Sequence, residues 1–100
     1  MDEYTFIKGM QGYINVAKTY YELEKALYGD IHGEGRIFDE LYSIVESLMS
    51  SYLGIYYHNN YVFDNCYYYI DKCILNKHNF DIKVFNTIVS NSLDIEANEA

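Results

Sequence analysis

The sequence contains no proline and no tryptophan, and it has one arginine and two cysteines among its 100 residues. An average chain of this length has about 5 prolines. No Asn-Gly or Asp-Gly pair separates alternating apolar runs, so the usual signals of a β-hairpin are missing. We therefore expect helices throughout.

Long apolar runs are also missing. A membrane-spanning helix needs about 20 consecutive apolar residues, whereas the longest runs here are only a few residues, such as Cys66 to Ile70. The N-terminal sequence MDEYTFIK has two acids ahead of its first base and lacks the basic and apolar regions of a signal peptide. We expect no membrane segment and a cytoplasmic location.

Positive charge is scarce, because 15 acidic residues stand against 7 basic ones, which gives a net charge of −8. The acids are spread along the chain. This balance disfavours direct binding of a nucleic-acid backbone. It suits a protein partner with a basic surface, which long-range electrostatics would attract. In the alternative interpretation, the charge serves solubility alone.

Residue usage indicates the source. Phe, Tyr, Met, Ile, Asn and Lys make up 47 residues, whereas Gly, Ala, Arg and Pro make up 11. These two groups correspond to AT-rich and GC-rich codons. We expect a bacterium of low GC content, or a phage or mobile element that lives in one.

The pattern of apolar residues predicts four helices, over about 2–28, 36–57, 61–76 and 81–93. With their short connections they predict an all-α protein, a small antiparallel four-helix bundle. Residues 1–93 would form a single domain, and residues 94–100 a frayed, acidic, flexible tail.

Three local features refine this expectation. Gly9 and Gly12 interrupt the first segment, so either the helix begins only near Gln11 or the glycines let another backbone approach closely. The glycine-rich stretch 29–35 is the clearest break in the chain. The loop at 58–60 is short enough to make the second and third helices an antiparallel hairpin.

The sequence offers no site for a metal, a cofactor or catalysis. Cys66 and Cys73 are two turns apart on one helix, too far for a disulfide, and their apolar surroundings predict free, buried thiols. The loop sequence GDIHG at Gly29–Gly33 matches one short signature of metallophosphoesterases. The other metal-binding elements of those enzymes are missing, so we assign no metal centre.

Tyrosine is the one residue type in clear excess, and seven of the thirteen tyrosines lie between Tyr52 and Tyr69. The consecutive residues Tyr67, Tyr68 and Tyr69 span about 200° of a helix, so at least one must leave the core. We expect this to be Tyr68, with Tyr57 as its counterpart on the second helix. Tyrosine provides large contact area at low entropic cost, which favours protein binding.

The sequence therefore predicts a small, acidic, non-enzymatic protein-binding protein. We expect an inhibitor of the DNA-mimic or anti-defence type, encoded by a phage or mobile element, that blocks a host nucleic-acid-binding enzyme. Acids would stand in for phosphates, and tyrosines would fill base-stacking pockets. The candidate partner-binding residues are Asp30, Glu34, Asp39, Glu40, Glu46, Tyr57 and Tyr68.

Two other functions fit the same sequence. One is an immunity protein or antitoxin that binds a single cognate toxin. The other is a small structural or regulatory subunit. We also expect a homodimer, because small residues on one face of the second helix would let a second copy approach closely. These residues are Ser43, Ser47, Ser50 and Gly54.

Overall fold

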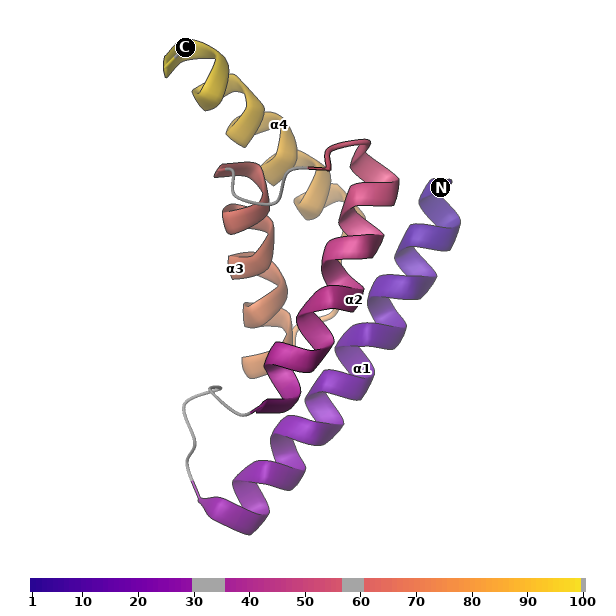
Figure 1. Cartoon of the computed structure of the whole chain (residues 1–100), viewed down its shortest axis with the longest axis vertical. Coiled ribbons are helices and arrows are strands. Elements are labelled where there is room, and N and C mark those ends of the chain that lie inside the picture. The colour runs from indigo at the N-terminus through magenta and orange to yellow at the C-terminus, as the bar shows by residue number, and fades with distance from the viewer. Residues whose placement is uncertain (30–35, 57–60, 100) are drawn as a thin grey trace.

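The structure, a computed structural model, describes residues 1–29, 36–56 and 61–99, with the backbone alone for residues 36–41 and 99. These ranges form four helices and no β-strand (Figure 1). The helices are α1 (Glu3–Tyr28), α2 (Arg36–Leu53), α3 (Tyr61–Leu75) and α4 (Ile82–Glu99). The prediction of an all-α chain with four helices is confirmed.

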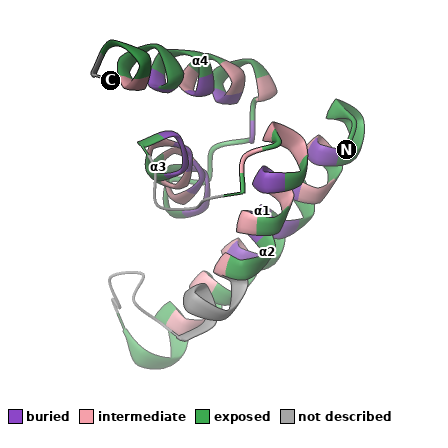
Figure 2. Ribbon diagram, turned by 45° about the horizontal axis from the view of Figure 1, so that its top comes forward, coloured by how far each residue is buried: buried purple, intermediate pink, exposed green. Residues whose placement is uncertain are grey.

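The helices pack as two neighbouring pairs. α1 and α2 lie side by side and run in opposite directions, α3 packs on α1, and α4 lies against α3 (Figures 1 and 2). We expected α2 and α3 to form the hairpin. Over the described residues, however, the α3 backbone approaches α1 and α4 more closely than α2. α2 and α3 meet through side chains, with the rings of Tyr42 and Tyr67 4.9 Å apart between centroids.

α1 begins at the N-terminus of the chain and not near Gln11. Asp2 caps it, because its carboxylate accepts a hydrogen bond of 2.7 Å from the Thr5 N–H. The helix then continues through both glycines. A Cβ atom on Gly9 would lie 2.8 Å from Cδ2 of Leu48, so glycine at this position lets a side chain of α2 approach. Gly12 has open space around it.

α2 ends at Leu53, so the predicted end at residue 57 is wrong. Gly54 has φ +71°, a left-handed conformation that glycine adopts without steric cost. Its N–H donates a 2.9 Å hydrogen bond to the Ser50 carbonyl, which closes the last turn of the helix. The apolar pattern continues into Ile55 and Tyr56 after the helix has ended.

α4 continues to Glu99, so the predicted end at residue 93 is also wrong. Asp81 caps its start, as its carboxylate accepts a 2.9 Å hydrogen bond from the Lys83 N–H. Near the other end, the Glu96 carboxylate accepts a 3.3 Å hydrogen bond from the Val62 N–H in the first turn of α3. The added turns of α4 therefore satisfy one of the free donors at the start of α3.

The core draws on all four helices and on Phe80, which precedes α4. Phe6 of α1 lies at its centre and stacks on Tyr52 of α2, with ring centroids 4.1 Å apart and an interplanar angle of 7°. Phe85 and Phe80 also pack on the Phe6 ring. The buried hydrophobic residues are Phe6, Met10, Tyr13, Ile14, Ala17, Val45, Met49, Val62, Phe63, Cys66, Ile70, Cys73, Ile74, Phe80, Phe85 and Val89.

Both cysteines are free and buried in this core, as predicted. Burial raises the pKa of the Cys66 thiol to about 12. Burial also raises the pKa of Cys73. Both groups are therefore protonated at neutral pH and chemically unreactive.

In the part of the chain that the structure describes, no helix has the length and apolar character that crossing a membrane requires.

Candidate protein-binding groove

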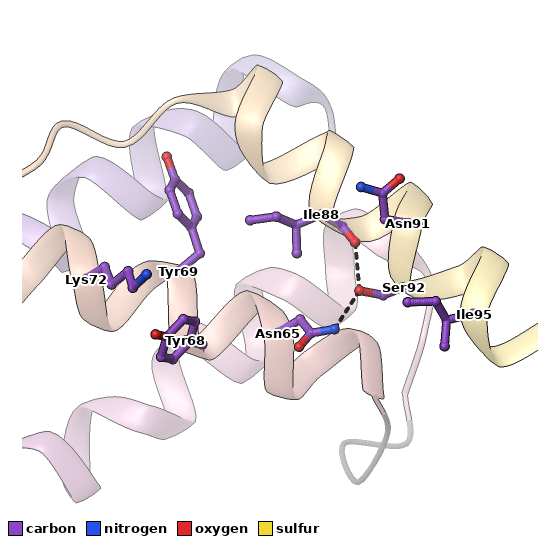
Figure 3. A pocket seen from close by; sticks show the side chains of 8 residues that line it. All are labelled: Asn65, Tyr68, Tyr69, Lys72, Ile88, Asn91, Ser92 and Ile95. Atoms are coloured by element: carbon purple, nitrogen blue, oxygen red, sulfur yellow. Dashed lines mark hydrogen bonds between the residues drawn. The ribbon is translucent and has the colours of Figure 1, made fainter.

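An open groove of about 330 Å³ lies between α3 and α4 (Figure 3). α3 and α4 each contribute four residues to its lining. These residues are Asn65, Tyr68, Tyr69, Lys72, Ile88, Asn91, Ser92 and Ile95. Grooves of this size are typical of binding sites in proteins.

The α3 wall is a line of side chains spaced at one helical turn. Asn65, Tyr68 and Lys72 follow one another at intervals of three and four residues, and Tyr61 extends the line by a further turn. Tyr68 is 65% exposed, so the prediction that it leaves the core is confirmed. The Lys72 ammonium lies 4.4 Å from the centroid of the Tyr68 ring, a cation–π contact that holds the ring at the edge of the groove.

The α4 wall has the same spacing. Ile88, Asn91 and Ile95 follow one another at intervals of three and four residues, and Val84 lies four residues earlier on the same line. Val84 and Ile95 are both partly exposed. Each wall therefore presents a continuous line of side chains, with one asparagine in each.

Hydrogen bonds between the helices hold the two walls in register. Asn65 donates from Nδ2 to the Ser92 hydroxyl over 2.9 Å, and that hydroxyl donates to the Ile88 carbonyl over 2.7 Å (Figure 3). At the other end, the Tyr69 hydroxyl accepts a 2.9 Å hydrogen bond from the Asp81 N–H. The groove is thus a feature of fixed width between two connected helices.

A second group of polar side chains lies on the opposite side of α3, where it faces α1 and α2. Burial raises the pKa of Tyr13 to about 12, and the Asp71 carboxylate contributes to the rise. Burial also raises the pKa of Asp71, although a hydrogen bond from the Tyr42 hydroxyl opposes this shift. The Tyr67 hydroxyl is buried and completes no hydrogen bond of good geometry among the described residues. Its pKa is raised by burial and, further, by the nearby Glu46 carboxylate.

This polar cluster is structural in character. Its members come from three helices, and each carboxylate has a tyrosine hydroxyl as a neighbour. Burial and the Tyr42 hydroxyl are the causes of the shift in the pKa of Asp71. Within the described ranges, no three histidine, cysteine, aspartate or glutamate side chains gather closely enough to hold a metal ion.

The predicted acidic site is only partly described. Asp30 and Glu34 lie outside the described residues, as does the rest of the stretch 30–35 that includes His32. Asp39 and Glu40 lie in the first turns of α2, but their side chains are outside the description. Glu46 is half-buried beside Tyr67, so it lies in the polar cluster and not on the free surface.

The two predicted tyrosines have different outcomes. Tyr57 lies outside the described residues. Tyr68 lies at the groove, and the structure places with it several residues that sequence reasoning missed: Asn65, Lys72, Ile88, Asn91 and Ile95. The regular spacing of Val84, Ile88, Asn91 and Ile95 was a readable signal that α4 has a second, partly apolar line beside its buried face.

The predicted dimer face on α2 is not a continuous surface. Ser43 and Ser47 are exposed, and the Ser47 hydroxyl donates a 2.9 Å hydrogen bond to the Ser43 carbonyl. Ser50 is only 5% exposed. Gly54 lies beyond the helix end, where its left-handed conformation explains why glycine is present. The four small residues therefore have different local roles.

Comparison with protein-family models, curated proteins and solved structures found no significant match.

Proposed function

We propose that this chain is a non-enzymatic protein-binding module whose groove between α3 and α4 receives an amphipathic helix of a partner protein. The observation that carries the proposal is the open groove of about 330 Å³ with the largely exposed ring of Tyr68 at its edge. An exposed aromatic ring next to further apolar side chains is a common feature of protein-binding surfaces.

The spacing of the walls favours a helix as the occupant. Both walls repeat their side chains every three or four residues. A third helix repeats its side chains at the same interval, so its apolar stripe fits between two such lines. The pair Asn65 and Asn91 would face a polar residue within that stripe and thereby fix the register of the bound helix.

Charge favours a basic partner. The net charge of −8 would attract a positively charged helix over long range. Asp64 on α3 and Asp94 on α4 are exposed on the two helices that form the groove. Lysine or arginine residues that flank the apolar stripe of the partner would lie near these acids.

The narrower prediction, an inhibitor that imitates DNA, shares Tyr68 with the groove but depends mainly on acids outside it. It depends on Asp30, Glu34, Asp39 and Glu40, whose side chains are outside the described residues, and on Glu46, which lies in the polar cluster. Its predicted stacking rings are Tyr57, which is outside the described residues, and Tyr68. That this chain blocks a nucleic-acid-binding enzyme therefore stays a prediction. The immunity-protein and regulatory-subunit functions likewise stay predictions, since a groove that binds a helix would serve each of them.

The test is a titration of the isotopically labelled full chain with a synthetic helical peptide of about 18 residues, long enough to form a helix when bound. The peptide carries leucines at intervals of three and four residues and lysines elsewhere. We expect chemical-shift changes concentrated at Asn65, Lys72, Ile88 and Asn91. Shift changes centred on α1 and α2, or none at millimolar peptide, would overturn the proposal.

A second peptide serves as the control for charge. It keeps every leucine and replaces each lysine by glutamate. If the partner is basic, this peptide should bind much more weakly, and the difference should shrink as salt is added because added ions screen the attraction. Equal binding of the two peptides would show that the groove has no preference for a basic helix.

A further inference from the structure

A second apolar surface lies on α1, away from the groove. Val16, Tyr20, Leu23 and Leu27 follow one another at intervals of four, three and four residues, which places them on one line of the helix. Each of these side chains is between 40% and 64% exposed. We call this line the α1 stripe. It runs along the half of α1 that ends at the exposed tip of the molecule (Figures 1 and 2).

The molecule exposes more surface than a compact monomer of its mass. Its accessible surface is 6437 Å², whereas a folded monomer of 11.8 kDa is expected to expose about 5,900 Å². Its radius of gyration is 14.1 Å, against about 13 Å for a compact domain of this length. The chain is therefore less compact than a typical monomeric domain of its size.

We propose that the α1 stripe binds the α1 stripe of a second copy of this chain, in antiparallel orientation about a two-fold axis. The spacing of four, three and four residues is the same when read in either direction. An antiparallel copy therefore places Val16 opposite Leu27 and Tyr20 opposite Leu23. Such an interface is closed and self-complementary, as most homodimer interfaces are.

The residues beside the stripe permit this approach. Thr19 and Ala26, on one side of the line, are small and uncharged. Lys18, Glu22 and Lys25 lie on other faces of the helix. Glu24 lies on the opposite edge of the line from Thr19 and Ala26, so the two Glu24 carboxylates would share one solvent-facing edge of the dimer and weaken it. The interface resembles a short coiled-coil seam, in which apolar residues repeat every 3.5 residues on average.

The size of the stripe indicates a weak dimer. It provides four side chains per copy, whereas each partner of a standard interface contributes about 20–30 residues. Dimerisation should therefore depend on concentration. This dimer uses α1 and leaves the groove between α3 and α4 free, so it is independent of the proposed partner.

Cysteine cross-linking tests the antiparallel register directly. The native thiols are buried, so an introduced cysteine is the reactive one under gentle oxidation. A mixture of the Val16→Cys and Leu27→Cys variants should form a disulfide-linked heterodimer. Each variant alone should cross-link far more slowly. In the antiparallel dimer, Val16 of one copy lies about 16 Å along the helix axis from Val16 of the other, and the same holds for the two Leu27 residues.

Two outcomes would overturn the inference. One is a mixture that cross-links no faster than the single variants. The other is faster cross-linking of Val16→Cys alone, which would indicate parallel helices. A mixed pair of Leu93→Cys and Leu27→Cys is the control, since Leu93 on α4 is 43% exposed and lies outside the stripe.

Sedimentation velocity provides a second measurement that needs no covalent bond. The native chain should shift toward dimer as its concentration rises, and Leu23→Glu should stay monomeric at the same concentrations. Leu93→Glu should behave like the native chain. Circular dichroism confirms that each variant is folded. A native chain that stays monomeric to millimolar concentration would overturn the inference.

Discussion

At the scale of the residue, Asp71 shows how burial changes the energetics of one side chain. It lies half-buried on α3, next to Tyr13 of α1 and Tyr42 of α2. Burial costs the charged form part of its hydration, and this raises the pKa of Asp71 although the Tyr42 hydroxyl donates a hydrogen bond to it. At neutral pH the charged carboxylate therefore opposes folding.

The raised pKa of Asp71 predicts the direction in which the stability of the fold changes with pH. A carboxyl group whose pKa is raised by folding stabilises the folded state below the pKa of the unfolded chain, and this stabilisation is lost as the pH rises through the pKa of the folded state. Asp71→Asn keeps the shape and the acceptor for Tyr42 without the charge. At pH 7 it should be more stable than the native chain, on the order of 0.5 kcal/mol because water screens a half-buried group.

Thermal unfolding between pH 3 and pH 7 measures this effect. The difference between Asp71→Asn and the native chain should vanish near pH 3, where Asp71 is protonated. Asp64→Asn is the control. Asp64 is exposed in the first turn of α3, where its negative charge interacts favourably with the helix dipole and stabilises the helix. It should lose a few tenths of a kcal/mol at pH 7. A less stable Asp71→Asn at pH 7 contradicts this account.

At the scale of the element, the helix ends show what the sequence could and could not predict. The break after Tyr28 follows from a local signal, the glycine at position 29. The start of α1 stayed open between the N-terminus and Gln11 in the sequence, and the structure places it at Glu3 with Asp2 as the cap. The end of α2 did not follow from the apolar pattern, since Ile55 and Tyr56 continue it. The end of α4 depends on the contact between Glu96 and Val62, which are distant in sequence.

Two glycines with similar open surroundings but different backbones provide a matched test. Neither Gly12 nor Gly54 has an atom within 4 Å of an added Cβ, but Gly54 has φ +71° and Gly12 lies inside α1. Gly54→Ala should destabilise the fold by about 1 kcal/mol, because alanine is strained in the left-handed region. Gly12→Ala should stabilise it by up to about 1 kcal/mol, because alanine favours a helix.

Chemical denaturation of the two variants measures these opposite changes. The midpoints should move in opposite directions, with little change in the slope of the unfolding transition. If both variants shift the midpoint in the same direction, the assignment of Gly54 as the residue that ends α2 is contradicted.

At the scale of the whole molecule, the sequence predicted the class of fold but not the arrangement of the helices. Apolar periodicity is a property of each helix alone, so it identified four helices and placed Tyr68 outside the core. Which helices pair is set by contacts such as Phe6 with Tyr52 and Asn65 with Ser92, which no local pattern specifies. The groove depends on the α3–α4 pair, so the sequence identified Tyr68 but not the residues of both helices that line the groove with it.

The central claim is that the groove between α3 and α4 binds a basic amphipathic helix, and one comparison of affinities tests it most directly. Tyr68 and Tyr4 are 65% and 68% exposed, and each has a lysine ammonium over its ring, from Lys72 and Lys8. They differ chiefly in position, because Tyr4 lies on α1, outside the groove.

The measurement is the dissociation constant of the lysine–leucine peptide for Tyr68→Ala and for Tyr4→Ala, each compared with the native chain. Removal of an aromatic hot-spot residue from a binding site weakens binding by about tenfold or more. We predict such a loss for Tyr68→Ala and a change of less than about twofold for Tyr4→Ala. Equal affinity of the two variants for the peptide would contradict the central claim.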